Sequence, residues 1–252
     1  MFDGYPLRKY DWKDWTLMIL VSSIILQIVA VVLMANFTAI SSNLDESGAQ
    51  AEFLLEVIAY KGTFYGTVIS LPLTLWVVYQ RKIPLFNRRG LSKEESFIVR
   101  GLTKEDWKFL LKYIPISYII YTAGSGLLAE LVGESEAANQ MAIESMFSYI
   151  PAWQLFIMIV VVAPITEELL FRGMVLFAGD RIETTWLRAV ISALAFGLVH
   201  TVGETDIFTL YTYIGMGVII TYGAKKTNSI EAGIVYHVLN NLLGFMMIIW
   251  FG

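Results

Sequence analysis

The chain contains no cysteine, so disulfide bonds, zinc–thiolate sites and cysteine nucleophiles are excluded. It has only two histidines, His200 and His237, and both fall in apolar segments. No basic tract of the kind that binds nucleic acid is present, and we expect no nucleic-acid partner. The sequence also offers no candidate Ser-His-Asp set. Hydrolytic chemistry on this chain would therefore use water as its nucleophile.

The sequence is rich in apolar residues. They make up 56% of the 252 residues, against about 45–50% in soluble domains. The mean hydropathy is +0.62. These values are typical of an integral membrane protein, and the length predicts a single membrane domain over residues 1–252.

Runs of about 20 apolar residues are long enough to cross a bilayer as helices. The sequence contains seven such runs, at about 15–37, 62–80, 109–132, 153–177, 186–203, 207–224 and 230–251. The first run is too long for a signal-peptide core and no clear cleavage site follows it, so we interpret it as a retained span. The expected fold class is an all-α integral membrane bundle of about seven transmembrane helices.

Basic residues are segregated among the connections between these spans. Of the 18 lysines and arginines, 17 fall on one side of the seven-span arrangement, and nine of these lie within residues 81–112. The positive-inside rule places that side in the cytoplasm, so the N-terminus is predicted inside and the C-terminus outside. Residues 81–112 are expected to form a cytoplasmic basic loop and the start of the third span. The small size points to a multi-pass protein of a bacterial plasma membrane.

Two connections show local patterns. In the basic loop, RGLSKEE at Arg89–Glu95 recurs as RGLTKED at Arg100–Asp106. Each copy has Ser or Thr followed three residues later by an acid, a pattern that caps helices, so Thr103 and Asp106 are expected to open the third span. On the outer side, residues 136–150 have helical spacing. They form either an eighth, interfacial helix or an ordinary ordered loop.

Charged residues lie inside the fourth apolar run. The stretch APITEELLFRG, Ala163–Gly173, carries Glu167, Glu168 and Arg172. A charge in hydrocarbon costs at least about 2.5 kcal/mol, so these groups should face a wet or protein-lined interior and are functional candidates. Pro164 stands three residues before Glu167 and removes a backbone donor. It either opens the helix ahead of the carboxylates or is a packing kink.

The fifth and seventh runs contain polar residues as well, in AFGLVH and YHVLNN. Three pairs are spaced i to i+4, one in each of the three runs: Glu168 and Arg172, Phe196 and His200, His237 and Asn241. Each pair shares a helix face, so the pairs can converge in the bundle interior. Asn240 is expected to face elsewhere. Counted from the predicted span ends, His200 lies roughly 10 Å deeper than His237, a gap that tilted helices or an earlier start of the fifth span near Thr184 would close.

The residue types point to hydrolysis. A glutamate in an apolar site can serve as a general base, and a histidine beside it can share the proton or position a water. A second histidine and an amide can stabilise an oxyanion. Alternatively, Glu167, His200 and His237 bind a metal, because two histidines and one carboxylate form a catalytic zinc set that leaves a position for water. The Glu168–Arg172 pair is interpreted as structural, with Arg172 neutralising the second carboxylate.

The three segments fit the patterns EExxxR, FxxxH and HxxxN, in that order, within residues 153–252. On these motifs the chain resembles the CPBP family of intramembrane proteases, also called the Abi family. That family includes Rce-type CAAX prenyl endopeptidases and bacterial relatives linked to bacteriocin self-immunity and peptide processing. The resemblance implies that residues 153–252 are a catalytic core, that Glu167 and His200 activate water, and that His237 and Asn241 form the oxyanion site. Residues with a supporting role would be Glu168, Arg172 and Phe196.

The resemblance implies an intramembrane endopeptidase that hydrolyses a peptide or membrane-protein substrate in the bilayer. The family is described both as metalloproteases and with a metal-free glutamate mechanism; we favour Glu167 as base and keep a zinc ion as the alternative. The rival class is a non-catalytic membrane scaffold or a bacteriocin self-immunity protein. A small transporter would also need intramembrane charges, but no repeated pair of interrupted spans supports inverted repeats.

Overall fold

The computed structural model describes residues 9–24, 28–29, 32–34, 36, 49–83, 85–86, 101–133, 138–178, 184–201 and 206–251. Of the described residues, 87% are helical and none is in a strand. The predicted all-α fold class is therefore confirmed.

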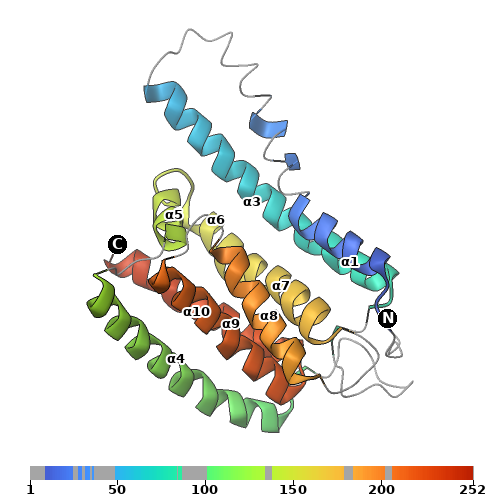
Figure 1. The fold of residues 1–252 in the computed structure, drawn as a ribbon. Helices are drawn as coiled ribbons and strands as arrows, with labels where there is room; N and C mark the ends of the chain where they lie inside the picture. Colours follow the sequence, from blue (N-terminus) through green and yellow to red (C-terminus); the bar gives the residue numbers. More distant parts are fainter. Residues whose placement is uncertain are drawn as a thin grey trace.

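The helices form a bundle whose central rod carries the two adjacent glutamates. In chain order the elements are α1 (Trp12–Ile19), η1 (Leu20–Ile24), α3 (Ala49–Gln80), α4 (Lys104–Val132), α5 (Ala138–Met146), α6 (Ala152–Leu155), η2 (Phe156–Val162), α7 (Ala163–Glu168), η3 (Leu169–Leu176), α8 (Trp186–His200), α9 (Ile207–Thr227) and α10 (Ile230–Phe251), where η denotes a π-helix. The segments α6, η2, α7 and η3 follow one another without a break and form this rod. In Figure 1, α1 and α3 run together along one flank and α4 lies on the opposite flank.

In the described part of the chain, five helices are long and apolar enough to cross a membrane, at Phe53–Gln80, Lys104–Val132, Ala152–Leu176, Ile207–Thr227 and Ile230–Trp250. The fifth predicted span, 186–203, is a shorter apolar helix that ends at His200. Its 15 residues reach about 22 Å at the usual rise per residue, less than a hydrocarbon core of about 30 Å. The first predicted span, 15–37, falls partly outside the described residues. Seven spans, and the orientation of the termini, remain predictions.

The second predicted span proved too short. Hydropathy placed its start at residue 62, because Glu52, Glu56 and Lys61 interrupt the apolar pattern before it. Helix α3 instead begins at Ala49, so residues 49–60 are helical and do not form a loop. Alanine, leucine, glutamate and glutamine are good helix formers, and they extend the helix beyond its apolar part.

Two predictions about connections can be compared with the structure. Helix α4 opens with Thr103 as its N-cap: Asp106 N donates to Thr103 Oγ1 over 3.2 Å, and Thr103 N donates to Asp106 Oδ2 over 2.8 Å. The predicted capping box is thus confirmed, while the copy around Ser92 lies outside the described residues. Within the stretch 136–150, α5 confirms a helix; its position at the membrane surface stays a prediction.

Helices α8 and α9 approach each other closely because small residues lie between them. A Cβ atom on Gly217 would collide with the carbonyl oxygen of Ala193, and one on Gly197 would collide with the backbone of Ile214. Small residues of this kind let membrane helices pack backbone to backbone. The contact brings Phe196 of α8 against Gly217 of α9 in the bundle interior.

A charged cluster fastens α1 to the end of α3. Arg81, which follows α3, donates from Nε to Asp14 Oδ1 and from Nη2 to Asp11 Oδ2, both over 2.8 Å. Asp14 is fully buried, and Asp11 and Asp14 cap α1 reciprocally. The N–H of Asp14 and, to a smaller extent, the Arg81 guanidinium hold the pKa of Asp11 below its usual range.

Replacing Arg81 by Met should loosen α1 from α3. Because the chain has no cysteine, spin labels on Trp12→Cys and Leu75→Cys report this spacing without background. Pulsed electron paramagnetic resonance should then give a longer mean distance between the two labels and a broader distance distribution. Lys112→Met, which removes an exposed charge on α4, should leave the distribution unchanged.

The same spacing should respond to acid. A carboxyl whose pKa is lowered by folding stabilises the fold above its ordinary value of about 3.9, and this contribution is lost as pH falls through the lowered value. Lowering the pH should therefore broaden the distance distribution of the unsubstituted chain. In Arg81→Met, where the contact is already lost, acid should broaden the distribution less. Equal broadening in both would contradict the assignment.

Candidate functional site

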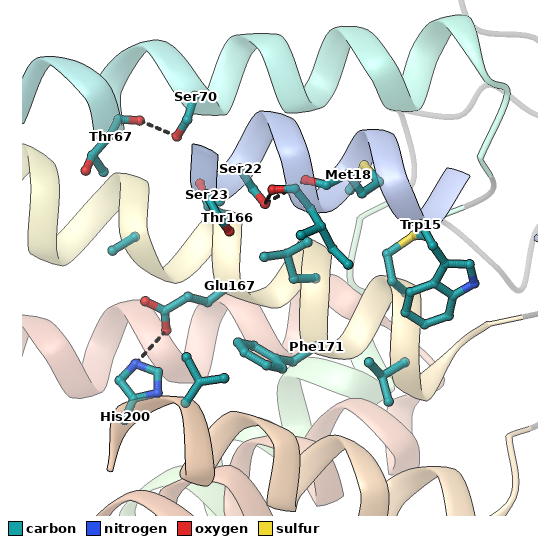
Figure 2. A pocket seen from close by; sticks show the side chains of 16 residues that line it. Trp15, Met18, Ser22, Ser23, Thr67, Ser70, Thr166, Glu167, Phe171 and His200 are labelled. Atoms are coloured by element: carbon teal, nitrogen blue, oxygen red, sulfur yellow. Dashed lines mark hydrogen bonds and ion pairs between the residues drawn. The ribbon is translucent and has the colours of Figure 1, made fainter. Parts of the chain in front are cut away.

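The structure brings together three of the predicted residues from three separate helices. Glu167 Oε2 in α7 lies 3.5 Å from His200 Nε2 at the end of α8 and 3.7 Å from His237 Nε2 in α10. Figure 2 shows the contact between Glu167 and His200. Helix α8 begins at Trp186, with Thr185 as its N-cap, and both imidazoles reach the same carboxylate oxygen despite the depth gap expected from the sequence.

Both glutamates lie on the short helix α7, which is flanked by the π-helices η2 and η3. Pro164 occupies the first turn of α7, where its missing N–H coincides with the change of helix type. In the π-helices, main-chain carbonyls accept from neighbouring helices: Ile159 O from Asn241 Nδ2 over 2.9 Å, and Phe171 O from Ser192 Oγ over 2.8 Å. π-helical turns are frequent at functional sites, and here they join the rod to α10 and α8.

Glu168 and Arg172 form a fully buried ion pair, with both side chains at 0% exposure. Arg172 Nη1 donates to Glu168 Oε1 over 2.7 Å, and Nη2 donates to the carbonyl oxygen of Gly217 over 3.1 Å. The guanidinium also lies 4.7 Å from the ring centre of Phe196, a cation–π contact. These contacts offset much of the cost of burying both charges and give Phe196 a place in the site, although Glu168 Oε2 and Arg172 Nε have no hydrogen-bond partner among the described residues.

The buried carboxylate of Glu168 also determines which ring nitrogen of His237 carries a hydrogen. His237 Nδ1 donates to Glu168 Oε1 over 3.0 Å. Gly233 leaves room for the other carboxylate oxygen, because a Cβ atom there would collide with Glu168 Oε2. With Nδ1 used as a donor, Nε2 of His237 accepts when the ring is neutral and donates when it is protonated. An oxyanion role for His237 therefore requires the protonated ring.

His200 is held by its own helix and by an aromatic residue that the sequence did not single out. Nδ1 lies 2.8 Å from the carbonyl oxygen of Phe196; since a carbonyl can only accept, Nδ1 carries a hydrogen and Nε2 faces Glu167. The ring stacks on Tyr213 of α9 at 5.2 Å and 15°, and packs against Phe196 at 4.6 Å. Tyr213 is one of three tyrosines in the apolar helix α9, and the sequence carries no signal that singles it out for this role.

Both the nitrogen and the oxygen of the Asn241 side-chain amide form hydrogen bonds. Nδ2 donates to Ile159 O, and Oδ1 accepts from Asn240 Nδ2 over 3.2 Å. An amide nitrogen has two N–H groups, so one remains for a ligand. Asn240 lines the same cavity as Asn241; the expectation that it faces elsewhere was wrong, because the helix turns it toward its neighbour's amide.

Two cavities of about 560 Å³ each meet at the Glu167–His200 pair, a size typical of ligand sites. The apolar chamber lies among α1, η1, α3, α7, η3 and the end of α8, and of its 16 described lining residues only Glu167 and His200 are charged groups or histidines. The polar chamber reaches α4, α9 and α10 and is lined by residues that include His237, Asn240 and Asn241. Glu167 thus has access to two environments of different polarity.

The predicted metal set can be tested against this geometry. Both imidazoles use Nδ1 as a donor and direct Nε2 toward Glu167, an orientation that metal-binding histidines share. In the described part of the chain, however, no group of three His, Cys, Asp or Glu side chains is arranged so that it could hold a metal ion. Glu167, His200 and His237 do not fit a metal as they lie, and no chemical step is derived through one.

Comparisons with known proteins locate the similarity in the region that carries this site. Residues 149–243 match the family described as type II CAAX prenyl endopeptidase Rce1-like. The UPF0177 protein YbdI of Lactococcus lactis subsp. lactis (strain IL1403) is 29% identical over 156 residues, which are 60% of this chain and 78% of that protein. No solved structure matches. The predicted resemblance to the CPBP family is confirmed, and at family level it supports a membrane-embedded endopeptidase.

Removing one member of the buried ion pair should destabilise the fold. Arg172→Met leaves Glu168 as an unpaired buried charge, which typically costs about 3–5 kcal/mol. Thermal unfolding in detergent should show a large loss of stability, whereas Lys108→Met, on the exposed side of α4, should not. The pair Glu168→Gln with Arg172→Met removes both charges and should recover much of the loss. A double variant as unstable as Arg172→Met would contradict this account.

Tyr213 should hold the ring of His200 in one orientation. With only two histidines in the chain, ¹⁵N-histidine labelling gives two resolvable imidazoles, assigned with His200→Gln. We expect Tyr213→Leu to shift the His200 signals and to mix its tautomers, and Tyr213→Phe, which keeps the stacked ring, to preserve them. The His237 signals serve as the internal control. Unchanged His200 signals in Tyr213→Leu would remove Tyr213 from the site.

Proposed function

We propose that the chain is an intramembrane endopeptidase in which Glu167 and His200 activate the attacking water. The observation that carries the proposal is the meeting of Glu167 Oε2 with the Nε2 atoms of both histidines, at 3.5 and 3.7 Å, where two chambers join. The family match supports the endopeptidase class. The arrangement of donors and acceptors supports the individual roles.

The spacing suits a water held among the three side chains. Direct hydrogen bonds of catalytic groups span roughly 2.6–3.2 Å, so the longer separations here leave room for a bridging water or for tightening when substrate binds. The water oxygen attacks the peptide carbonyl while its proton passes to Glu167. The carbon–nitrogen bond then breaks, and Glu167 returns the proton to the leaving amine. His200 shares the proton through Nε2, because its Nδ1 is committed to the Phe196 carbonyl.

His237 and Asn241 are the proposed donors to the oxyanion. His237 would donate from Nε2 in its protonated form, and Asn241 from the N–H that Ile159 does not use. Losing one such donor typically lowers kcat by about 10²–10³. Glu168 and Arg172 are proposed as positioning residues: Glu168 holds Nδ1 of His237, Arg172 holds Glu168, and neither lines a chamber.

The polar chamber is the proposed source of water. Buried water is found where two to four polar partners are available, and His237, Asn240, Asn241 and Thr212 line this chamber. Apart from Glu167 and His200, the polar groups that line the apolar chamber are hydroxyls, and it has no amide side chain. Substrate and water would thus reach Glu167 from different sides.

Glu167→Gln should abolish cleavage while leaving the fold intact, because the change is nearly isosteric and removes only the base. General-base catalysis contributes about 10²–10⁴-fold, so at least a hundredfold loss is expected. The measurement compares the peptides in membranes and medium of cells that carry the intact or the Glu167→Gln protein at matched abundance. Glu130→Gln, on the exposed side of α4, is the matched control.

Two other results would change the assignment. Identical peptide profiles, with Glu167→Gln still complementing a deletion phenotype, would make the chain a scaffold or a bacteriocin self-immunity protein. Purified protein should also cleave in the presence of a chelator. Activity lost on chelation and restored by zinc would instead make Glu167, His200 and His237 metal ligands.

A further inference from the structure

We propose that the apolar chamber binds an extended, uncharged peptide segment beside the scissile bond, with Thr166 as a hydrogen-bonding partner of its backbone. This inference rests on the proposed function and specifies its substrate. Glu167 and His200 line both chambers, so a segment in the apolar chamber is continuous with the bond that faces the activated water.

The walls of the chamber argue against charged substrate residues. Apolar surface comes from α1 through Trp15 and from η3 through Leu170, Phe171 and Met174. Apart from Glu167 and His200, the described lining residues carry no charged group. A charged side chain that enters here and does not reach Glu167 or His200 would lose its hydration without gaining a charged partner, which disfavours its binding.

Thr166 provides the observation that points to a ligand. Its side chain is only 7% exposed, and Oγ1 has no hydrogen-bond partner among the described residues. Thr166 lines the apolar chamber and not the polar one, and it directly precedes Glu167. A buried hydroxyl without a partner is destabilising, so a peptide N–H or C=O placed here would satisfy it.

Further hydroxyl groups favour a peptide over an alkyl chain. Ser23 of η1 and Thr67 of α3 also line the chamber, and in Figure 2 Thr166 and Ser23 lie in the space between α7 and η1. Inside a bilayer, every backbone polar group of a bound peptide must find a partner. An alkyl chain would fill the apolar walls but would leave Thr166 without a partner.

The first test removes the hydroxyl and keeps the shape. With a peptide whose release depends on Glu167, Thr166→Val should raise KM about five- to tenfold, the loss of one hydrogen bond, with little change in kcat. The matched control is Thr221→Val. Thr221 is likewise buried with an unpartnered Oγ1 among the described residues, but it lines neither chamber, so KM should not change. Equal KM values for both variants would overturn the role of Thr166.

The second test reverses the charge preference. Lysine is placed in turn at each position on either side of the scissile bond. The unsubstituted protein should cleave these lysine peptides at least tenfold more slowly than the parent peptide when the lysine lies on one side of the scissile bond, and at the normal rate when it lies on the other. Ser23→Asp should restore cleavage of one such lysine peptide, and Ser23→Asn should not. A gain of activity cannot arise from misfolding, and lysine tolerated on both sides would contradict the proposal.

A binding experiment separates the two proposals, because it needs no catalysis. Glu167→Gln protein in nanodiscs is exposed to a neutral apolar octapeptide with a benzophenone group, to the same peptide with one lysine, and to a benzophenone-tagged long-chain alkyl probe. Cross-links from the neutral peptide to η1 or to the segment around Thr166 support the chamber's role even if no Glu167-dependent cleavage is found. Labelling of this segment by the alkyl probe alone would overturn it and indicate a lipid site.

Discussion

The buried contact among Glu168, Arg172 and His237 determines the geometry of the whole site. One carboxylate oxygen accepts from the guanidinium over 2.7 Å and from the imidazole over 3.0 Å. The guanidinium in turn binds the Gly217 carbonyl, so a single ion pair joins the central rod to α9 and α10. Because an unpaired charge at this depth would be very costly, the three helices are held in one arrangement.

Two adjacent carboxylates can have different roles because successive residues on an α-helix point about 100° apart. Glu168 faces the packed interior and is fully buried, whereas Glu167 retains 25% exposure and faces the chambers. The structural carboxylate is neutralised by Arg172. Among the described residues, the ion-pair contacts of the proposed catalytic one are with the two imidazoles.

Sequence spacing predicted some contacts and missed others for a clear reason. The i to i+4 rule gave the Glu168–Arg172 ion pair and the contact of His200 with Phe196. It also paired His237 with Asn241, yet Asn241 bonds to the Ile159 carbonyl of η2 and to Asn240. The carbonyl becomes available where the helix is π-helical, and the motif contains no sign of that change.

The sequence by itself determined that the chain is a helical membrane protein, which helices carry the polar residues, and which of these share a helix face. Only the tertiary structure decided that Glu167 meets both histidines, that Tyr213 and Gly233 belong to the site, and that two chambers of different polarity join there. In a membrane, lipid-facing and interior-facing helix surfaces are similarly apolar, so hydropathy cannot tell which faces meet. That choice depends on close packing at small residues and on the pairing of buried charges.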